Sequence, residues 1–312
     1  MSFKCKDLLG IEYLDKKDLQ VVLDSVKPFK SLFTRSVKKT PTLIGKTVVM
    51  LFYEPSTRTR TSFEIAAKRL SADVVNVAIN TSSVIKGESL IDTGKTLEAM
   101  NADYIIIRHS MSGAPYMLAK NLAASVINAG DGFHEHPTQG LLDLYTIYEK
   151  KKKIEGLRVL LVGDILHSRV AKSNIWALTK MGAEVAVVGP PTLIPLNIEE
   201  LGVKVYYDLD EAIKKADVIN ILRIQLERQF ESLFPSVHEY VELYQVTKER
   251  LAMAKPKVLV MHPGPMNRGI EISSDAADSS NAVINEQVTN GIAVRMAVLY
   301  LLNPRRGNVY SN

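Results

Sequence analysis

The chain has 312 residues, 46% of them hydrophobic and 23% charged, which is an ordinary composition for two globular domains. Its single cysteine, Cys5, excludes a disulfide framework and a cysteine-based zinc site, and the net charge of +5 is modest for a nucleic-acid surface. No apolar run approaches membrane-spanning length and Met1–Lys4 begins no signal peptide, so we expect a cytoplasmic protein with no membrane or nucleic-acid partner.

Apolar periodicity predicts strands and helices that alternate along the whole chain. The first half shows strands at 47–53, 74–79, 104–107 and 125–128. Its predicted helices cover 12–36, about 62–70, a segment after residue 88 that ends near 100, a segment near 116–123, and a segment after 139. The second half shows strands at 158–162, 184–188, 203–207, 218–222 and 257–261 and a last helix over about 286–302. This alternation predicts the α/β class, with two doubly wound parallel-sheet domains: 1–148, on which 286–312 packs back, and 149–285.

The segment 52–61, Phe-Tyr-Glu-Pro-Ser-Thr-Arg-Thr-Arg-Thr, joins the first predicted strand to a helix. The first N–H groups of a helix have no internal partner and carry the positive end of its dipole. The hydroxyls of Ser56, Thr57 and Thr59 and the guanidinium of Arg58 add further donors, so this turn predicts a receptor for a tetrahedral oxyanion such as phosphate. The alternative is capping, with Thr61–Glu64 as a capping box, but capping alone needs neither two arginines nor four hydroxyls.

Polar residues also follow the other predicted strands. Ligands of doubly wound sheets bind outside the carboxyl ends of the strands. One arginine at such an end is best explained as a surface charge or a structural ion pair, but four of them beside an oxyanion turn indicate substrates with several negative charges. The residues at these ends are Ser56, Thr57 and Arg58; Arg108; His136 and Gln139; Arg169; Arg223 and Gln225; and His262–Pro265.

His136 is a candidate hydrogen-bond donor to a substrate carbonyl. A neutral imidazole suits this role, because a cation-rich pocket lowers the pKa of a histidine. A histidine that only supports the structure stays open as an alternative.

Neither a metal nor a nucleotide cofactor is expected. His134 and His136 could both line an extended segment as metal ligands, but no third ligand stands at a familiar spacing and H-E-x-x-H is missing. The strand at 158–162 and the following Gly163 invite comparison with dinucleotide-binding folds, yet G-x-G-x-x-G is also missing.

Several motifs resemble those of the carbamoyltransferase family, in order and spacing, over essentially the whole chain. They are Ser56-Thr57-Arg58-Thr59-Arg60, Lys86-Gly87-Glu88, Arg108-His109, His136-Pro137-Thr138-Gln139, Arg223-Ile224-Gln225 and His262-Pro263-Gly264-Pro265. Within the family, the run from Arg223 to Arg228 looks like the aspartate-specific members, and the His-Cys-Leu-Pro motif of the ornithine-specific members is replaced by His262–Pro265. One departure is His167, where some relatives have tyrosine two residues before the arginine that matches Arg169.

The resemblance implies transfer of the carbamoyl group of carbamoyl phosphate to the amine of L-aspartate, in the cleft between the two domains and without a cofactor. The products would be N-carbamoyl-L-aspartate and phosphate, in an early step of de novo pyrimidine biosynthesis. The implied ligands of the phosphate are Ser56, Thr57, Arg58, Thr59 and Arg108. Thr57, Arg108 and His136 would polarise the carbamoyl oxygen, and Gln139 and the carbonyls of Pro263 and Gly264 would hold the carbamoyl amine. Arg169, Arg223 and Gln225 would bind the carboxylates of aspartate in the second domain.

The resemblance further implies a homotrimer with shared active sites. Ser82 and Lys86 would reach the carbamoyl phosphate site of the neighbouring subunit, where Lys86 would also contact aspartate. Glu54 is expected to pair with one of the arginines, and association with another enzyme of the pyrimidine pathway stays open. The competing class is a phosphate- or nucleic-acid-binding module without catalysis, which explains the arginines but not His136 together with Gln139.

Overall fold

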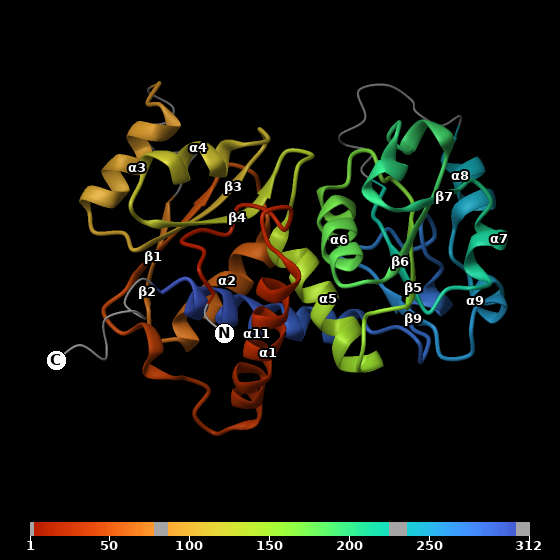
Figure 1. Cartoon of the computed structure of the whole chain (residues 1–312), viewed down its shortest axis with the longest axis horizontal. Helices are drawn as coiled ribbons and strands as arrows, with labels where there is room; N and C mark the ends of the chain where they lie inside the picture. Colours follow the sequence, from red (N-terminus) through yellow and green to blue (C-terminus); the bar gives the residue numbers. More distant parts are fainter. Residues whose placement is uncertain (1–2, 78–86, 225–235, 304–312) are drawn as a thin grey trace. The chain divides into compact units, whose positions relative to one another are not determined.

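The structure, a computed structural model, describes residues 3–77, 87–224 and 236–303. The chain divides into two compact units (Figure 1): unit 1 comprises Met1–Leu141 and Asn290–Asn312, and unit 2 comprises Leu142–Thr289. Each unit is built around one parallel sheet with helices on its faces, which confirms the predicted fold class of two parallel α/β domains. Among the described helices, none is long and apolar enough to cross a membrane.

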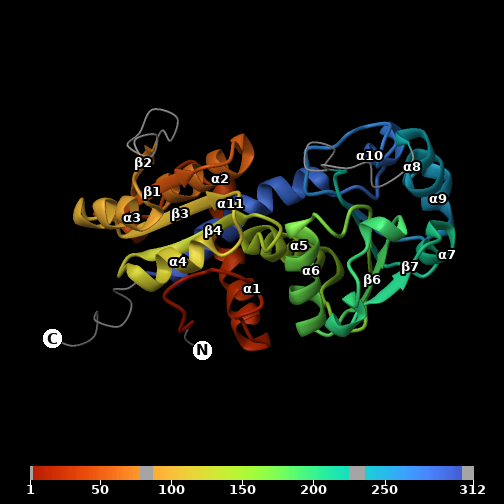
Figure 2. The ribbon, with the colours of Figure 1, turned by 90° about the horizontal axis from the view of Figure 1, so that it is seen from above.

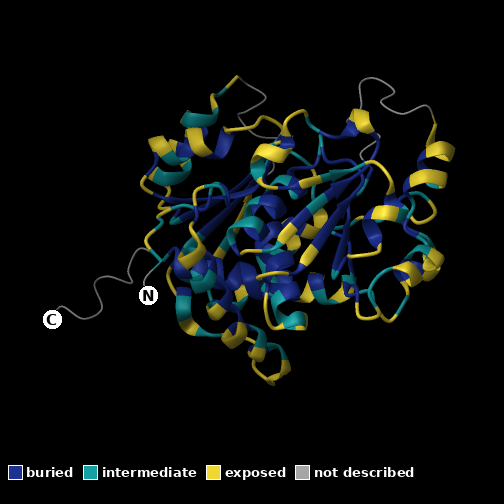
Figure 3. Cartoon of the chain, turned by 45° about the vertical axis from the view of Figure 1, so that its right-hand side comes forward, coloured by how far each residue is buried: buried dark blue, intermediate teal, exposed yellow. Residues whose placement is uncertain are grey.

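The sheet of unit 1 has the strand order β2-β1-β3-β4 and is parallel throughout. Its strands are β1 (Thr47–Phe52), β2 (Asp73–Val77), β3 (Tyr104–His109) and β4 (Ser125–Asp131). Strands β1 and β3, inside the sheet, are mainly apolar, and they and the edge strand β4 are largely buried (dark blue in Figure 3), whereas the other edge strand, β2, is largely exposed. Burial of both faces is the reason that the two inner strands, β1 and β3, lack a polar alternation.

Helices cover both faces of this sheet (Figures 1 and 2). On one face, α3 (Leu90–Ala99) and α4 (Ala114–Asn121) pack on alternate strand residues such as Leu51 and Ile105. On the other face lie α1 (Lys16–Ser31), α2 (Thr57–Arg69) and the later part of α11 (Ile284–Leu301). The hydroxyl of Tyr104 donates to the carbonyl of Leu299 at 3.2 Å, so a hydrogen bond joins helix α11 to strand β3.

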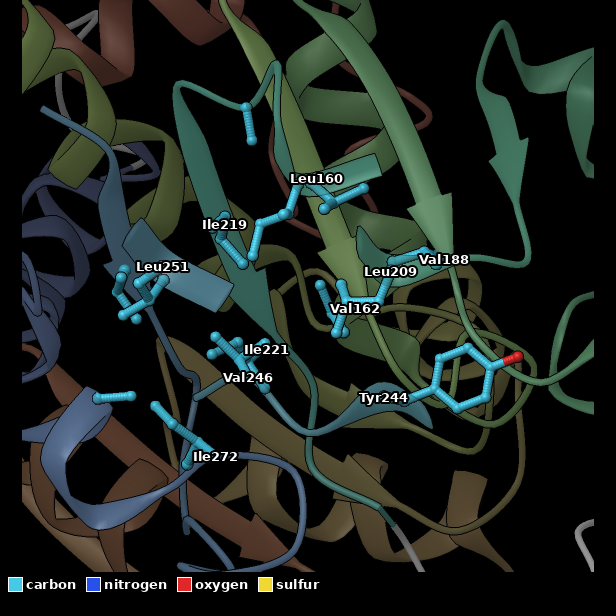
Figure 4. Close-up of a cluster of buried hydrophobic side chains, with 14 of the residues drawn as sticks. Leu160, Val162, Val188, Leu209, Ile219, Ile221, Tyr244, Val246, Leu251 and Ile272 are labelled. Carbon is cyan, nitrogen blue, oxygen red and sulfur yellow. The ribbon is translucent and has the colours of Figure 1, made fainter. Parts of the chain in front are cut away.

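The sheet of unit 2 has the order β7-β6-β5-β8-β9 and is also parallel. Its strands are β5 (Arg158–Val162), β6 (Glu184–Val188), β7 (Lys204–Tyr206), β8 (Val218–Ile221) and β9 (Leu259–Met261). Helices α7 (Leu209–Ile213), α8 (Val237–Tyr244) and α9 (Lys248–Met253) enclose one core with the sheet, shown in Figure 4. The unit also holds α6 (Arg169–Lys180) and α10 (Ser274–Ala277), and α5 (Pro137–Lys151) begins in unit 1 and continues into unit 2. Short 3-10 turns occupy Leu32–Thr34, Pro41–Leu43, Pro191–Leu193 and Ile198–Leu201.

The predicted strands are confirmed to within a few residues wherever the structure describes them. Two helix predictions were wrong at their ends. The first helix is shorter than 12–36, because Asp15 forms a capping box at its start and a 3-10 turn ends it after Ser31. Helix α2 begins at Thr57 rather than near residue 62, because its first turn is polar and carries no apolar periodicity for a sequence pattern to detect.

Candidate functional site

Three polar segments of unit 1 follow strands that are neighbours in its sheet. Ser56 and its successors follow β1, Arg108 lies at the end of β3, and His136 follows β4. In the register of the sheet, Phe52 is opposite Arg108, and His109 is opposite Asp131. Strands β1 and β3 also flank the point where the strand order reverses, which is where ligands of such sheets bind. Ser56, Arg108 and His136 therefore follow the carboxyl ends of neighbouring strands at one edge of this sheet.

The N-terminus of α2 has the geometry expected of an anion receptor. Ser56 is the N-cap residue, with φ −161° and ψ 89°, and its side chain makes no capping hydrogen bond. The capping alternative for Thr61–Glu64 is wrong, because these residues lie inside the helix. Thr57 and Arg58 are exposed, whereas Thr59 is buried. The first-turn N–H groups and these hydroxyls can thus face a ligand while the body of the helix packs in the core.

Arg108 is held in place by neighbours from both adjacent strands. Its Nε lies 3.3 Å from Oε2 of Glu54, in the loop after β1, and its Nη1 donates to the carbonyl of Ala129 in β4 at 3.2 Å. The expected ion pair between Glu54 and an arginine is confirmed. A guanidinium fixed by a carboxylate and a carbonyl has its remaining donors aimed in a defined direction.

His136 and Gln139 lie at the start of α5. His136 is 4% exposed, and its carbonyl accepts hydrogen bonds from the N–H groups of Gln139 at 2.9 Å and Gly140 at 3.2 Å. The turn before it depends on Gly132, whose φ is +44° and where an added Cβ would lie 2.7 Å from the backbone nitrogen of Ser112. No side chain other than hydrogen fits this close approach, so the glycine sets the path from β4 to His136.

A second histidine, His134, belongs to a cluster that the sequence did not predict. Its Nε2 lies 2.8 Å from Oε1 of Glu12, and its Nδ1 lies 3.1 Å from Oδ2 of the buried Asp131. The hydrogen bond to Asp131 is the main cause that raises the pKa of His134 to about 9. Burial raises the pKa of Asp131, but hydrogen bonds from His134, the Gly113 N–H and Asn128 outweigh it and lower that pKa overall. His134 therefore forms a charged link between the N-terminal segment and the turn after β4.

Within the described residues, the ligand atoms of Glu12, His134 and Glu135 lie within 4.8 Å of one another. This group does not contain His136, so it is not the two-histidine arrangement considered from the sequence. The contacts of His134 with Glu12 and Asp131 account for the arrangement. No sequence signal marks the cluster, because Glu12 lies 122 residues from His134.

Unit 2 places its candidate residues after three neighbouring strands, β5, β8 and β9. Arg169 is the first residue of α6 after β5, Arg223 lies two residues after β8, and Pro263 and Gly264 follow β9. Strands β5 and β8 flank the reversal of strand order in this sheet. These four residues therefore follow the carboxyl ends of neighbouring strands of unit 2.

The buried guanidinium of Arg169 lies at the positive end of a helix dipole. Arg169 is 5% exposed, and Ser168 caps the helix by accepting from the N–H of Ala171 at 3.1 Å. Two residues earlier, Nδ1 of His167 lies 2.9 Å from Oδ1 of the fully buried Asp164, which orients the imidazole ring.

Three predicted site residues, Ser82, Lys86 and Gln225, lie outside the described residues.

Comparison with known proteins identifies the family. The chain matches two family models, the aspartate/ornithine carbamoyltransferase carbamoyl-P binding domain over residues 6–149 and the Asp/Orn binding domain over residues 155–302. The aspartate carbamoyltransferase catalytic subunit of Endomicrobium trichonymphae is 85% identical over 312 residues, which is 100% of both chains. The corresponding subunit of Halothermothrix orenii is 61% identical over 99% of this chain and 98% of its own.

Solved structures of aspartate transcarbamoylases are also similar to this chain in fold. The catalytic subunit of M. jannaschii aspartate transcarbamoylase has a TM-score of 0.85 and 36% identity, covering 97% of this chain and 100% of that one. The Trypanosoma cruzi aspartate transcarbamoylase, solved with carbamoyl phosphate and aspartate, has a TM-score of 0.87 and 29% identity, covering 96% and 97% of the two chains. The chain therefore belongs to the aspartate/ornithine carbamoyltransferase family, and catalytic subunits of aspartate carbamoyltransferase match it over its full length.

Proposed function

We propose that this chain is the catalytic subunit of an aspartate carbamoyltransferase. It transfers the carbamoyl group of carbamoyl phosphate to the amine of L-aspartate and releases N-carbamoyl-L-aspartate and phosphate, an early reaction of pyrimidine biosynthesis. The single observation that carries the proposal is the placement of a hydroxyl-rich helix N-terminus, an ion-paired arginine and a buried histidine at the carboxyl ends of the neighbouring strands β1, β3 and β4. The catalytic subunit that is 85% identical over the full chain supports the choice of reaction.

Unit 1 would bind carbamoyl phosphate. Its phosphate is a tetrahedral dianion that suits the start of α2, where the hydroxyls of Ser56, Thr57 and Thr59 and the guanidinium of Arg58 add to the helix N–H groups. Arg108 is fixed by Glu54 and Ala129, so its remaining donors can serve the phosphate and the carbamoyl oxygen together. The side chain of Gln139 and the carbonyls of Pro263 and Gly264 would accept from the carbamoyl amine.

The chemical step needs no covalent bond to the protein. The neutral amine of aspartate attacks the carbonyl carbon, a C–N bond forms, and the carbonyl oxygen becomes an oxyanion. This oxyanion is stabilised by Thr57, Arg108 and His136, whose donors are positioned before the reaction starts. The C–O bond to phosphate then breaks, the carbonyl is restored, and the departing phosphate takes the proton that the nitrogen gives up.

Unit 2 would bind aspartate. Arg169, Arg223 and Gln225 are proposed to hold its two carboxylates, and a pair of guanidinium groups favours a dicarboxylate over the cationic side chain of ornithine. Arg169 is buried at the N-terminus of α6, where the helix dipole adds to its attraction for a carboxylate.

The assembly is proposed to be a cytoplasmic homotrimer with shared active sites. Ser82 and Lys86 of one subunit would complete the carbamoyl phosphate site of the next, which requires the closed ring that cyclic symmetry provides. Lys86 would also contact aspartate.

An assay of carbamoyl-aspartate formation tests the proposed reaction. The purified chain is given carbamoyl phosphate with aspartate or, in parallel, with ornithine, and each carbamoylated amino acid is measured by mass spectrometry. We expect product with aspartate and almost none with ornithine. A chain that gains thermal stability with carbamoyl phosphate but forms no product would instead be a phosphate-binding module.

A further inference from the structure

A buried carboxylate, Asp143, anchors a hydrogen-bonded network in unit 2 that the proposed reaction does not use. Asp143 lies in α5 and is fully buried. Its Oδ2 accepts from Nδ2 of Asn174 at 2.8 Å and from Nδ2 of Asn220 at 3.3 Å, and its Oδ1 accepts from Nε2 of Gln287 at 2.8 Å. A carboxylate surrounded by three amide donors determines which way each amide points, because only the –NH₂ side can face it.

The amide of Gln287 connects Asp143 to the loop after β9 through hydrogen bonds at both of its ends. Since its –NH₂ group faces Asp143, its carbonyl oxygen faces away, and Oε1 accepts from the backbone N–H of His262 at 2.9 Å. Gln287 is 2% exposed, so water does not compete for either bond. The first residue of the loop is thus fixed through α11 and α5.

The imidazole of His262 fixes the next part of the loop. The N–H of Gly264 donates to Nδ1 at 2.8 Å, so Nδ1 carries a lone pair and the ring proton is on Nε2. Nε2 faces Oε1 of Glu271 at 3.1 Å, and both side chains are fully buried. The same Glu271 oxygen accepts from the N–H of Asn267 at 2.6 Å. Three backbone N–H groups of the loop are therefore held by buried side chains.

The contact between Gly264 and His262 has a direct consequence for the proposed carbamoyl site. In a planar trans peptide unit, the N–H of one residue and the C=O of the preceding residue point in opposite directions. Because the N–H of Gly264 points at His262, the carbonyl of Pro263 must point away from the ring. Gly264 has a φ of +63°, which glycine adopts without strain, and Pro265 has no N–H that could compete for the carbonyls.

We infer that His262, Glu271 and Gln287, anchored by Asp143, are positioning residues that aim the carbonyl of Pro263 at the amine of the carbamoyl donor. The inference rests on the proposed function. None of the four side chains touches the substrate in this scheme. The network makes the enzyme selective for a donor that carries an N–H group on its carbonyl carbon, since a misdirected carbonyl would lose that hydrogen bond and leave the phosphate contacts intact.

Acetyl phosphate provides the matching probe, because a methyl group replaces the amine and the rest of the molecule is kept. The dissociation constants of carbamoyl phosphate, acetyl phosphate and inorganic phosphate are measured by calorimetry for the wild-type chain and its variants. In His262→Gln the amide is displaced toward Glu271, and the N–H of Gly264 loses its acceptor. We expect carbamoyl phosphate to bind about tenfold more weakly, the value of one hydrogen bond, while the other two ligands change less than about twofold.

Two further variants control the experiment. His262→Asn keeps an oxygen near the place of Nδ1, so it should restore the preference for carbamoyl phosphate over acetyl phosphate. Tyr244→Phe removes a hydrogen bond in the same unit, from the Tyr244 hydroxyl to the carbonyl of Tyr207 at 3.0 Å, and it does not touch the loop. It should lower the melting temperature without changing the preference.

The outcomes separate the inference from its alternatives. Equal weakening of all three ligands in His262→Gln, or an unchanged preference at a lower melting temperature, would show that the network only stabilises unit 2. If that variant does not fold, Gln287→Leu provides the same comparison, and equal binding of carbamoyl and acetyl phosphate by the wild-type chain would overturn the inference without any variant. A wild-type chain that forms no carbamoyl-aspartate would instead contradict the proposed function.

Discussion

The Nε atom of Arg108 lies 3.3 Å from Oε2 of Glu54, which ties the end of β3 to the loop that follows β1. Glu54→Gln keeps the shape of the side chain and removes its charge, so Arg108 loses its orienting partner. We expect kcat to fall by about tenfold, since this ion pair orients a donor to the oxyanion. The KM for carbamoyl phosphate should not rise, because a negative charge has left the neighbourhood of the phosphate.

The matched control for this variant is Glu64→Gln. Glu64 pairs with Lys68 at 2.7 Å on the surface of α2, so its replacement removes a carboxylate of the same unit without touching Arg108. Its steady-state kinetics should equal those of the wild-type chain. An unchanged kcat in Glu54→Gln would mean that Arg108 is oriented by other contacts.

His136→Ala should lower kcat far more than it weakens binding of carbamoyl phosphate. The proposed hydrogen bond strengthens as the carbonyl oxygen becomes an oxyanion, so its loss is felt in the transition state. We expect a loss on the order of 100-fold in kcat, the usual effect of removing one oxyanion donor. Pre-steady-state turnover and the dissociation constant of carbamoyl phosphate are the two measurements. Weak binding with normal turnover at saturation would make His136 a ground-state contact only.

Hybrid trimers test the proposed sharing of active sites. Homotrimers of Lys86→Ala and of Arg58→Ala should each be nearly inactive, because every site lacks one phosphate ligand. When the two are refolded together, some sites receive both defects and others receive neither, so activity should reappear. Chromatography of differently tagged chains shows that hybrids have formed. Hybrids without activity would mean that Lys86 does not serve a neighbouring subunit.

The stability of unit 1 should depend on the protonation of His134. The pKa of this histidine is raised from its ordinary value of 6.5 to about 9, chiefly by its hydrogen bond to Asp131. Its contribution is therefore complete below about pH 6.5 and is lost as the pH rises through 9. The urea midpoint of the wild-type chain should exceed that of His134→Asn at pH 6.5, and the difference should shrink toward pH 9.5. A difference that stays constant over this range would contradict the assignment.

The sequence by itself determined the order and nearly the bounds of the strands, because each inner strand is an apolar run and each run ends in polar residues. It also determined which residues meet at the sheet edges, since Ser56, Arg108 and His136 follow strands whose carboxyl ends share one edge in any parallel sheet of this order. Helix α2 begins among the hydroxyl residues after Pro55, as the turn predicted, but apolar spacing alone placed its start near residue 62, because the periodicity of a helix marks only the face that packs.

Only the tertiary structure decided the partners of the buried polar side chains. Asp143 and Gln287 are 144 residues apart, and Glu12 and His134 are 122 residues apart, yet each pair is hydrogen-bonded at 2.8 Å. A buried polar group must find a partner, but its own sequence neighbourhood does not say which element will supply one. That choice depends on which helices and strands the packing of the core brings together. The backbone of the loop at Pro263 and Gly264 is held by hydrogen bonds that this packing makes possible.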